Sequence, residues 1–252
     1  MNNISTTIIT LNEEKNIKGV IDSISGCCND IIVVDSMSTD NTVKIAKSLG
    51  AKVYVQKYLG DGLQKHYGVQ FAKNDWILSI DADERLNESS IRVINDLDLN
   101  NTKFDAFAIK RKTFIGNRWI KLWYPDFTVR LYNKNRMRYR PIKGHSFVET
   151  KNFKKLDCDI LHYSYQDYSD MIARMNRFSA RGAEMLDEKG VKASHFDPFF
   201  HALFAFIMKF VLKRGAFHGL DGFTVSMLSA VSTYMKYMKL IEIRENRYKN
   251  TE

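Results

Sequence analysis

Cysteine and proline are scarce in this 252-residue sequence, which has three residues of each type and 13 glycines. Cys27 and Cys28 are adjacent and Cys158 stands alone, so the sequence has neither a C-x-x-C motif nor the spacing of a disulfide framework or a zinc site. The few glycines and prolines also exclude collagen-like and low-complexity proteins. We therefore expect an ordinary globular protein of a reducing cytosol.

Long apolar runs are missing as well. The longest candidate, Pro198–Leu212, contains His201 and Lys209 and falls short of the ~18 apolar residues that a membrane span needs. The amino terminus has neither a basic region nor an apolar stretch of signal-peptide length. The sequence therefore predicts neither a membrane-spanning helix nor a cleaved leader.

The charge of the chain is positive overall and unevenly distributed. Residues 1–100 carry 10 Lys and Arg against 14 Asp and Glu, a net charge of −4, whereas residues 101–252 carry 28 against 15, a net charge of +13. Surplus lysine often forms no more than a solvated surface. It also suits an anionic partner such as nucleic acid, a phosphorylated substrate or a membrane surface.

The first hundred residues alternate between strand-like and helix-like patterns. Ile31–Val34 is a short apolar run that ends at Asp35, which is typical of a strand buried on both faces. Strands that alternate with helices predict βαβ units and a parallel sheet. The expected strands are Ile4–Thr10, Ile31–Val34, Val53–Val55 and Trp76–Ile80, and the expected helices are Ile17–Ile24, Ser38–Leu49 and Gln64–Ala72.

After residue 100 the pattern changes to longer strands and then to helices. Longer strands are expected at Phe104–Thr113 and Thr128–Tyr132, and short strands at Phe147–Thr150 and Cys158–Leu161. From Asp167 onward apolar residues recur at helical spacing. We therefore predict an α/β protein in which a nucleotide-binding half continues into a mixed sheet and ends in a helical tail.

Polar residues follow the expected parallel strands at the ends where such sheets bind ligands. Helix capping would explain several of them, above all Asp40 and Asn87. It explains Asp81 and Asp83 less well, because two carboxylates one residue apart repel each other unless a cation or a ligand compensates them. The residues at strand ends are Thr10, Asn12 and Glu13 after the first strand, Asp35 after the second, and Asp81 and Asp83 after the fourth.

Carboxylate oxygens at such a position suit Mg²⁺ or Mn²⁺, which keep coordination positions open for substrate phosphates. The sequence has neither the Gly-x-Gly-x-x-Gly run of a dinucleotide site nor the Gly-x-x-x-x-Gly-Lys run of a P-loop. We therefore expect a metal ion and side chains such as Lys65 to hold the phosphates.

Three runs of the first half share their form with a known family: Thr10–Glu14, Val33–Thr42 and Leu78–Glu84, which contains Asp81-Ala82-Asp83. They resemble the inverting family-2 glycosyltransferases of GT-A fold. The later stretches Trp123–Asp126, Val129–Tyr132 and Leu161–Tyr165 are similar to a narrower branch. That branch contains bacterial lipopolysaccharide inner-core β-1,4-glucosyltransferases, which act on heptose, and the resemblance covers nearly the whole chain.

The resemblance implies a GT-A domain over residues 1–165, a Rossmann-like, mostly parallel sheet that continues into a mixed acceptor-side sheet. Residues 1–100 would form its nucleotide-sugar half and residues 101–165 its acceptor half, followed by a helical region at 166–252. The implied reaction is the transfer of glucose from UDP-glucose to a heptose of the lipopolysaccharide inner core. Another UDP-sugar, or another polysaccharide or lipid-linked acceptor, is the alternative.

The resemblance also implies a nucleotide pocket. Thr10, Asn12 and Glu13 would line it, and Asp35 would accept a hydrogen bond from the uracil N–H. Lys65 would lie near the nucleotide, where the family usually has arginine. The site would therefore gather residues from the ends of the first two strands and from the helix that follows the third.

The remaining site residues would perform the chemistry. Asp81 would lie near the ribose, and Asp83 would hold the divalent metal, Mg²⁺ or Mn²⁺, that bridges the diphosphate, with His162 as an additional contact. Asp126 matches the catalytic base, which takes the proton of the acceptor hydroxyl opposite the departing nucleotide. The metal offsets the charge that builds on the leaving group, so no catalytic acid is required.

Several residues have a structural alternative. Asp126 is otherwise a turn residue after Pro125, and His145 and His162 are otherwise hydrogen-bonding histidines of a loop or strand. The branch tends to have His-Glu where this chain has His145-Ser146, which removes support for a role of that pair. Trp119, Trp123 and Tyr124 would either stack on sugar rings or pack in a core.

The tail also has two interpretations. The aromatic-rich helix Phe199–Leu212, which is followed by Lys213 and Arg214, would either be buried in the protein or lie in a membrane interface. A lipid-linked, phosphorylated acceptor favours the interface. We therefore expect a cytoplasmic protein that associates peripherally with the anionic inner face of the cytoplasmic membrane.

Two other function classes are alternatives. A nucleotidyltransferase usually has a glycine-rich basic loop after its first strand, whereas Leu11–Glu14 is acidic. A non-catalytic membrane- or RNA-binding module would use basic residues with stacking aromatics, of which Arg136, Arg138 and Arg140 with Tyr139 form a small group. The acidic cluster at the strand ends argues against nucleic acid as a partner.

Overall fold

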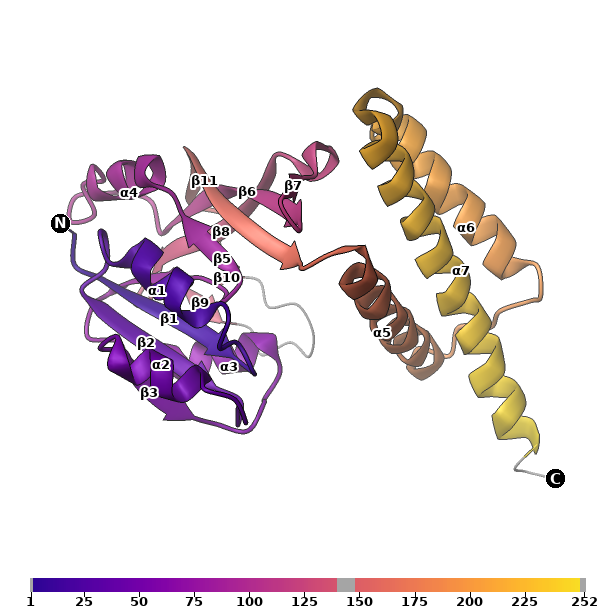
Figure 1. Cartoon of the computed structure of the whole chain (residues 1–252), viewed down its shortest axis with the longest axis horizontal. Helices are drawn as coiled ribbons and strands as arrows, with labels where there is room; N and C mark the ends of the chain where they lie inside the picture. The colour runs from indigo at the N-terminus through magenta and orange to yellow at the C-terminus, as the bar shows by residue number, and fades with distance from the viewer. Residues whose placement is uncertain (1, 140–147, 250–252) are drawn as a thin grey trace. The chain divides into compact units, whose positions relative to one another are not determined.

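The computed structural model describes residues 2–139 and 148–249, and these residues form two compact units (Figure 1). The first unit comprises residues 1–113 and 124–164, and the second comprises residues 114–123 and 165–252. Arg140, the pair His145-Ser146 and Phe147, the expected start of one short strand, lie outside the described residues.

Among the described residues, nine strands form one mixed sheet in the order β3-β2-β1-β4-β8-β6-β11-β5, with β7 paired to β6. A separate pair joins β9 (Arg138–Tyr139) to β10 (Val148–Glu149). The strands of the main sheet are β1 (Ile4–Thr10), β2 (Asp30–Asp35), β3 (Lys52–Val55), β4 (Trp76–Ser79), β5 (Glu84–Leu86), β6 (Ala106–Ile115), β7 (Arg118–Trp119), β8 (Asp126–Asn133) and β11 (Phe153–Tyr165).

The parallel part of the sheet contains β3, β2, β1 and β4, as the alternation of strands and helices predicts. β1 pairs in parallel with β2 and with β4, and the pairing with β2 sets Thr10 opposite Asp35. β4 pairs antiparallel with β8, and β8 pairs antiparallel with β6, so the sheet is mixed from there on. The expected α/β fold, with a mixed GT-A-like sheet and a helical C-terminal segment, is confirmed.

Helices cover both faces of this sheet. α1 (Ile17–Ile24), α2 (Thr42–Ser48) and α4 (Glu88–Asn95) contribute to the larger apolar core on one face. α3 (Asp61–Val69) packs on the other face, over β1 and β2. The periodic apolar residues of α1 that indicate a helix in the sequence are all buried; they are Ile17, Val20, Ile21 and Ile24.

Gly68 allows α3 to approach the sheet closely. A Cβ atom at this position would lie 2.9 Å from Cγ2 of Val34 and 3.3 Å from Cγ2 of Thr7, so only glycine fits without displacing a strand residue. The preceding turns of the same helix carry Gln64 and Lys65. The close packing therefore holds these two side chains beside the ends of the parallel strands.

The elements β5, α4, α2 and β11 differ from the expected pattern. β5 and α4 follow Asp83 directly, and Asn87 caps α4 by accepting a hydrogen bond from Ser90 N at 2.9 Å, as its capping interpretation predicts. α2 begins only at Thr42, because the Asp40 carboxylate accepts from Thr42 N at 3.0 Å and the preceding residues bind the β1 loop instead. β11 spans thirteen residues rather than four, because it continues past Leu161 to Tyr165 and begins already at Phe153.

The second unit contains α5 (Tyr168–Glu188), α6 (Asp197–Ile207), a π-helical turn (Met208–Leu212), a 3₁₀ turn (Gly215–His218) and α7 (Gly219–Lys249). The segment 114–123, which links β6 to β8, belongs to this unit, and its Ile120 is fully buried with Ile115, Met171 and Val225. α6 and α7 lie side by side (Figure 1). Within the described residues, none of the helices combines the length and the apolar character that crossing a membrane requires.

Candidate active site

The ends of β1 and β2 meet through a buried carboxylate. Asp35 is 1% exposed, and its Oδ1 accepts hydrogen bonds from the hydroxyl of Thr10 at 2.8 Å and from the hydroxyl of Ser38 at 2.5 Å. Its Oδ2 accepts from Ser38 N at 2.8 Å. The predicted pair Thr10 and Asp35 is therefore in direct contact, and three hydrogen bonds from the chain orient the carboxylate.

Side chains also join the loops that follow these two strands. Asn12, whose φ of 55° is left-handed, accepts a hydrogen bond from Thr39 N at 2.8 Å through its side-chain oxygen, and its own N–H donates to the hydroxyl of Ser38 at 2.8 Å. Glu13 N donates to the hydroxyl of Thr42 at 2.7 Å. Asn12 and Glu13 thus occupy one ordered surface with the β2 loop.

Asp81 follows β4 and forms ion pairs with two cations of the chain. Lys65 Nζ lies 2.6 Å from its Oδ1, and Arg130 Nη2 lies 3.0 Å from its Oδ2. Burial alone raises the pKa of Asp81, but the charges of Lys65 and Arg130 outweigh burial and hold this pKa well below its usual range. The charge of Asp81, which the sequence suggests must be compensated, is therefore balanced by the protein itself.

A β-bulge in β8 sets the direction of the Arg130 side chain. The pairing of β6 with β8 shifts from Phe107–Leu131 to Ala108–Val129, so Arg130 is an extra residue of β8 without an opposite partner on β6. Such a bulge turns a side chain away from the regular alternation. The guanidinium of Arg130, 6% exposed, contacts both Asp81 and the fully buried Glu84.

Glu84 completes this buried ion cluster, which we define as Arg130, Asp81, Glu84 and Lys65. Its Oε2 accepts a hydrogen bond from Asp81 N at 3.0 Å, while Oε1 faces Arg130. Burial is the main influence on Glu84 and raises its pKa, whereas the two carboxylates raise the pKa of Arg130 despite its burial. Arg130 therefore stays charged and links β8 to the Asp81–Glu84 turn.

Asp83 faces β11 rather than the buried ion cluster. Its Oδ2 lies 3.4 Å from Nε2 of His162, and its carbonyl accepts a hydrogen bond from Tyr163 N at 2.9 Å. The other ring nitrogen of His162 lies 3.4 Å from the hydroxyl of Thr113, and the hydroxyl of Ser164 lies 2.8 Å from Nε2. The structure thus brings together the two residues that the sequence analysis expects to contact a metal.

Asp83 and His162 can supply some, but not all, of the ligands of a divalent cation. Residues 2–139 and 148–249 contain no group of three or more His, Cys, Asp or Glu side chains that could hold a metal ion. Asp83 and His162 offer one carboxylate and one imidazole, which suit Mn²⁺ and, through the carboxylate, Mg²⁺. A cation held by these two residues would need diphosphate oxygens and water to complete its coordination.

Asp126 is the first residue of β8 and is therefore not a turn residue. Arg111, its opposite residue on β6, donates to Asp126 Oδ2 from Nε at 2.9 Å and from Nη2 at 2.5 Å. Both of these hydrogen bonds end on Oδ2 and leave Oδ1 unengaged by Arg111. The side chain is 39% exposed.

β6 carries one residue that contacts Asp126 and a second residue that contacts the Asp83–His162 pair. Arg111 and Thr113 are two residues apart on one strand, so their side chains point to the same face of the sheet, with their backbones about 7 Å apart. Arg111 contacts Asp126, and Thr113 contacts His162, which contacts Asp83. A half-exposed carboxylate and a pair suited to a cation therefore lie on one face of the sheet.

Two further residues hold the site in place and were not singled out from the sequence. Gln64 is fully buried and donates to the hydroxyl of Ser36 and to the carbonyl of Gln56, both at 3.1 Å. Arg85 donates to the carbonyls of Ala82 and Glu84, both at 2.7 Å, which fixes the turn that carries Asp81 and Asp83. Arg130 has a sequence signal, because it is a charged residue between the apolar Val129 and Leu131, whereas Arg111 lies in the basic run Lys110–Lys112 and has none.

Other residues named from the sequence have structural contacts. Trp123 packs against the core of the second unit, where its ring lies 6.4 Å from that of Tyr165. Arg136 donates to the backbone carbonyls of Thr102 and Phe104 at 3.0 and 3.3 Å. The hydroxyl of Tyr124 donates to Asp159 at 3.1 Å. Packing and hydrogen bonding within the fold account for the positions of these three side chains.

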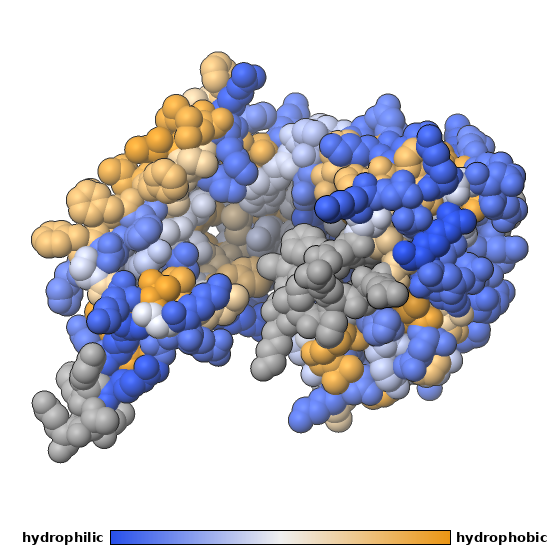
Figure 2. Space-filling model, turned by 180° about the vertical axis from the view of Figure 1, so that it is seen from behind, coloured by the Kyte–Doolittle hydropathy of each residue, from blue (hydrophilic) through white to orange (hydrophobic). Residues whose placement is uncertain are grey.

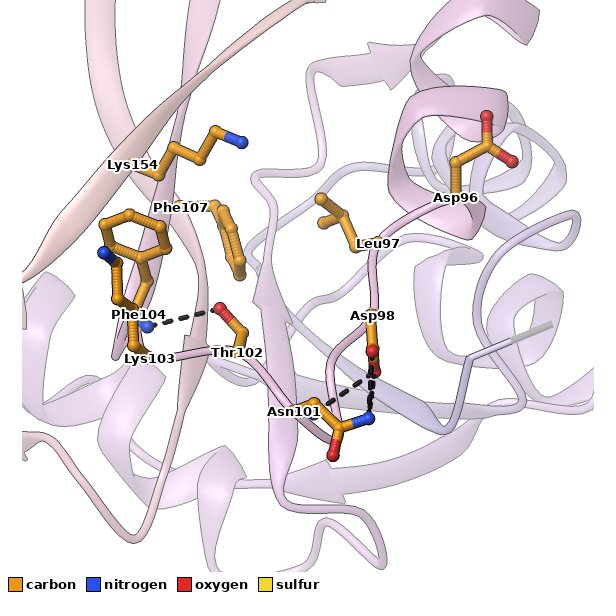
Figure 3. Close-up of a pocket in the computed structure, with 9 residues that line it drawn as sticks. All are labelled: Asp96, Leu97, Asp98, Asn101, Thr102, Lys103, Phe104, Phe107 and Lys154. Atoms are coloured by element: carbon orange, nitrogen blue, oxygen red, sulfur yellow. Dashed lines mark hydrogen bonds between the residues drawn. The ribbon is translucent and has the colours of Figure 1, made fainter.

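An open hollow of about 340 Å³ lies away from these residues (Figure 3). Most of its lining residues follow α4 and precede or begin β6, Lys154 belongs to β11, and the nearby Leu99 carbonyl accepts a hydrogen bond from Trp76 at the start of β4. Asp81 follows the other end of β4. The hollow is therefore not part of the candidate site. Its lining is Asp96, Leu97, Asp98, Asn101, Thr102, Lys103, Phe104, Phe107 and Lys154.

Replacing Arg130 tests the buried ion cluster. Arg130→Met leaves Glu84 buried without its cation, so we expect the free energy of unfolding to fall by about 3–5 kcal/mol. Because Glu84 can avoid a buried charge by staying protonated, the pKa of this carboxyl in the folded variant rises above its unfolded value. The stability of the variant should therefore be highest at low pH and fall as the pH rises through that raised pKa.

Urea denaturation at pH 5 and pH 8 measures both effects. Arg92→Met is the matched control, because Arg92 pairs with Glu88 on the exposed surface of α4, and it should change stability very little. Arg130→Met/Glu84→Gln should recover most of the loss. An Arg130→Met protein as stable as the Arg92→Met protein would show that the buried ion cluster does not hold the turn.

The chain matches known proteins over most of its length. The model of glycosyl transferase family 2 matches residues 5–161. An uncharacterized glycosyltransferase of Rickettsia typhi is 33% identical over 96% of this chain and 88% of its own length, and the lipopolysaccharide core biosynthesis glycosyltransferase LpsC of Rhizobium meliloti is 24% identical over 95% and 92%. The crystal structure of S. aureus TarS 1–349 is 14% identical, covers 97% of this chain and 92% of its own, and has a TM-score of 0.49. By the family match and the Rickettsia relative, this chain belongs to glycosyl transferase family 2.

Proposed function

We propose that this glycosyltransferase moves glucose, with inversion, from UDP-glucose to a heptose of the lipopolysaccharide inner core. The observation that carries the proposal is the single sheet face that holds Asp126, Arg111, Thr113, His162 and, through His162, Asp83. Inverting transfer needs a base on one side of the sugar and charge compensation for the leaving diphosphate on the other. Asp126 would perform the first task, and Asp83 with His162 would perform the second.

The ends of β1 and β2 would bind the nucleotide. A carboxylate has about four lone-pair sites, and Asp35 uses three of them for Thr10 and Ser38, so one site on Oδ2 would accept the uracil N–H. Asn12 and Glu13 would line the same pocket. Asp81 would lie near the ribose, and Lys65, which pairs with Asp81, would lie near the diphosphate.

Asp83 and His162 would hold Mg²⁺ or Mn²⁺ together with the diphosphate of the donor. The bound cation would supply positive charge to the departing UDP, so that no protein acid has to protonate it. The buried ion cluster supports this division of tasks, because Asp81 is neutralised by Lys65 and Arg130 while Asp83 is directed to β11. A bound cation would then have to compensate Asp83 but not Asp81.

Asp126 would be the base that takes the proton of the acceptor hydroxyl. Arg111 holds Oδ2 through two hydrogen bonds and thereby orients Oδ1 without occupying it. An attacking hydroxyl would need to lie within hydrogen-bond reach of this oxygen, on the face of the sugar opposite the diphosphate. Inversion follows from this arrangement.

Two observations support the proposed acceptor: the similarity to LpsC and the positive charge of the second half of the chain. LpsC is named as a lipopolysaccharide core biosynthesis enzyme, and it aligns with 95% of this chain. The net charge of +13 after residue 100 suits a phosphorylated, lipid-linked saccharide. Such an acceptor would be met at the inner face of the cytoplasmic membrane, where the protein would associate peripherally and without a nucleic-acid partner.

Removing the Asp83 carboxylate should abolish metal-dependent binding of the nucleotide. We expect Asp83→Ala to bind UDP with the same affinity with and without Mn²⁺, because the remaining imidazole of His162 is a single ligand. Titration calorimetry measures this directly and needs no turnover. Asp22→Ala, which removes an exposed carboxylate of α1, is the control and should keep the wild-type response to Mn²⁺. A Mn²⁺ dependence that survives in Asp83→Ala would overturn the assignment.

Neutralising Asp126 should affect the chemical step and not the donor affinity. We expect Asp126→Asn to lower kcat by about 10²–10⁴-fold, the usual contribution of a general base, with UDP affinity unchanged. Asp157→Asn is the matched control, because Asp157 also pairs with a basic residue of β6, Lys110, but is 98% exposed. If the two variants lose the same small amount of kcat, Asp126 is not the base.

The donor is tested by the release of UDP from isotope-labelled UDP-sugars in the presence of a heptose-containing core acceptor. We expect UDP-glucose to be turned over faster than UDP-galactose and UDP-N-acetylglucosamine, because a few hydrogen bonds to individual hydroxyls distinguish these sugars. Omitting the acceptor should reduce the release to background. Equal or faster turnover of either competitor would show that the proposed donor is wrong.

A further inference from the structure

α6 carries an apolar stripe that faces solvent. Its residues recur at spacings of three and four, which places them along one side of a helix, and they are 41–73% exposed. Four of the six are phenylalanine. Exposure of so many large apolar side chains on one helix is unusual for a surface that meets only water. The stripe consists of Phe196, Phe199, Phe200, Leu203, Phe204 and Ile207.

The side of α6 that packs on α7 is a different one. Phe206 and Phe210 each place their rings 6.0 Å from the ring of Phe223 on α7, and they also stack on one another at 5.1 Å. These ring contacts are part of the packing between the two helices of the hairpin. The solvent-facing stripe is therefore additional apolar surface and not the packing face of α6.

α7 and the connection between the two helices extend the exposed surface. On α7, Met227, Val231 and Met238 recur along the helix and are 38–42% exposed. In the connection, Leu212 and Phe217 are 65% and 84% exposed. Figure 2 shows apolar side chains gathered in a band along the edge of the helical unit. We call the α6 stripe together with these five residues the apolar hairpin face.

The part of the hairpin around the connection between α6 and α7 is mainly basic. Residues 198–241 contain five Lys and Arg but only one acidic residue, Asp221. Asp221 already pairs with Arg118 at 2.6 Å. Lys213 and Arg214 are both exposed and lie between Leu212 and Phe217, so positive charge sits next to the apolar surface.

The connection that carries these residues is tightly packed. A Cβ atom on Gly222 would lie 1.9 Å from the carbonyl oxygen of Gly215, so the 3₁₀ turn and the start of α7 are in backbone contact. Arg214 has a left-handed φ of 59°. The exposed basic and aromatic residues are therefore presented on a defined turn.

We propose that the apolar hairpin face docks on an anionic phospholipid surface, with the aromatic stripe in the headgroup boundary and Lys213 and Arg214 on the headgroups. Aromatic residues on one side of a helix enter this boundary, and neighbouring basic residues gain from anionic lipids. A second copy of the chain is a poorer occupant. At the connection it would bring Lys213 and Arg214 of two hairpins together, where Asp221, the only acidic residue within 198–241, is already paired with Arg118.

Flotation of the full chain with lipid vesicles tests the docking without any turnover, so its result is independent of the proposed donor, metal and base. We expect the protein to float with phosphatidylglycerol-containing vesicles at low salt and much less with phosphatidylcholine vesicles. Screening acts over about 8 Å at 0.15 M salt, so raising the salt should weaken the association. A protein that stays with neither vesicle at low salt, or binds both equally, overturns the proposal.

Two sets of variants test the contributions of the basic residues and of the aromatic stripe to lipid binding separately. Lys213→Glu/Arg214→Glu should weaken binding to anionic vesicles by at least about tenfold, since each basic residue near such a surface contributes measurably. Lys44→Glu/Lys47→Glu makes the same charge change on the exposed surface of α2 and should leave binding unchanged. Equal losses in the two double variants would mean that net charge, and not this face, attracts the lipid.

The aromatic stripe is tested by Phe199→Ser/Phe204→Ser, which removes two solvent-facing rings and leaves Phe206 and Phe210 in place. We expect vesicle binding to fall, with the helical circular dichroism and the UDP affinity retained. Ile172→Ser, an exposed apolar residue of α5, is the control. If wild-type protein instead forms a dimer in light scattering that this variant abolishes, and lipid binding is absent, the face is an interface between copies and the lipid proposal is wrong.

Discussion

The buried guanidinium of Arg130 is the contact on which the site depends. It lies between Asp81 and Glu84 with 6% of its side chain exposed, and Lys65 completes the charge balance. These contacts join β8 to the turn after β4 and hold the two ends of the Asp81–Glu84 segment. Because both ends are anchored inward, Asp83 between them is directed toward His162 on β11. A carboxylate pair that would repel in isolation is thereby separated into one internal charge and one available charge.

The antiparallel half of the sheet brings the remaining groups to the same place. β8 contributes Arg130 through a bulge and Asp126 at its first residue, while β6 and β11 contribute Arg111, Thr113 and His162. Side chains from strands that are distant in sequence meet because alternate residues of neighbouring strands share a face. In the proposed reaction, the hydrogen-bonded loops after the parallel strands would bind the nucleotide, and the antiparallel strands would supply the groups for the acceptor and the cation.

The second unit combines a well-packed interior with an apolar exterior. Ile120 from the segment between β6 and β8 is buried with Met171 and Val225, so the helices have a core of their own. Phe206, Phe210 and Phe223 contact one another ring to ring within the hairpin. The two interpretations of the aromatic-rich tail therefore concern different sides of one helix: some rings pack within the protein and others face outward. Hydrophobicity alone cannot separate them, because both sides of α6 are apolar.

The sequence by itself determined the alternation of strands and helices, the parallel order of the first sheet half and the polar residues at the strand ends, because each follows from local periodicity and from the direction of parallel strands. The resemblance to family-2 glycosyltransferases grouped Thr10 with Asp35 in one pocket and Asp83 with His162 at one metal. Only the tertiary structure decided that Lys65 and Arg130 neutralise Asp81, that Arg111 orients Asp126, and that the segment 114–123 packs with the helices. These depend on a bulge, on strand register and on contacts between residues far apart in sequence, and no periodicity of the chain encodes such distances.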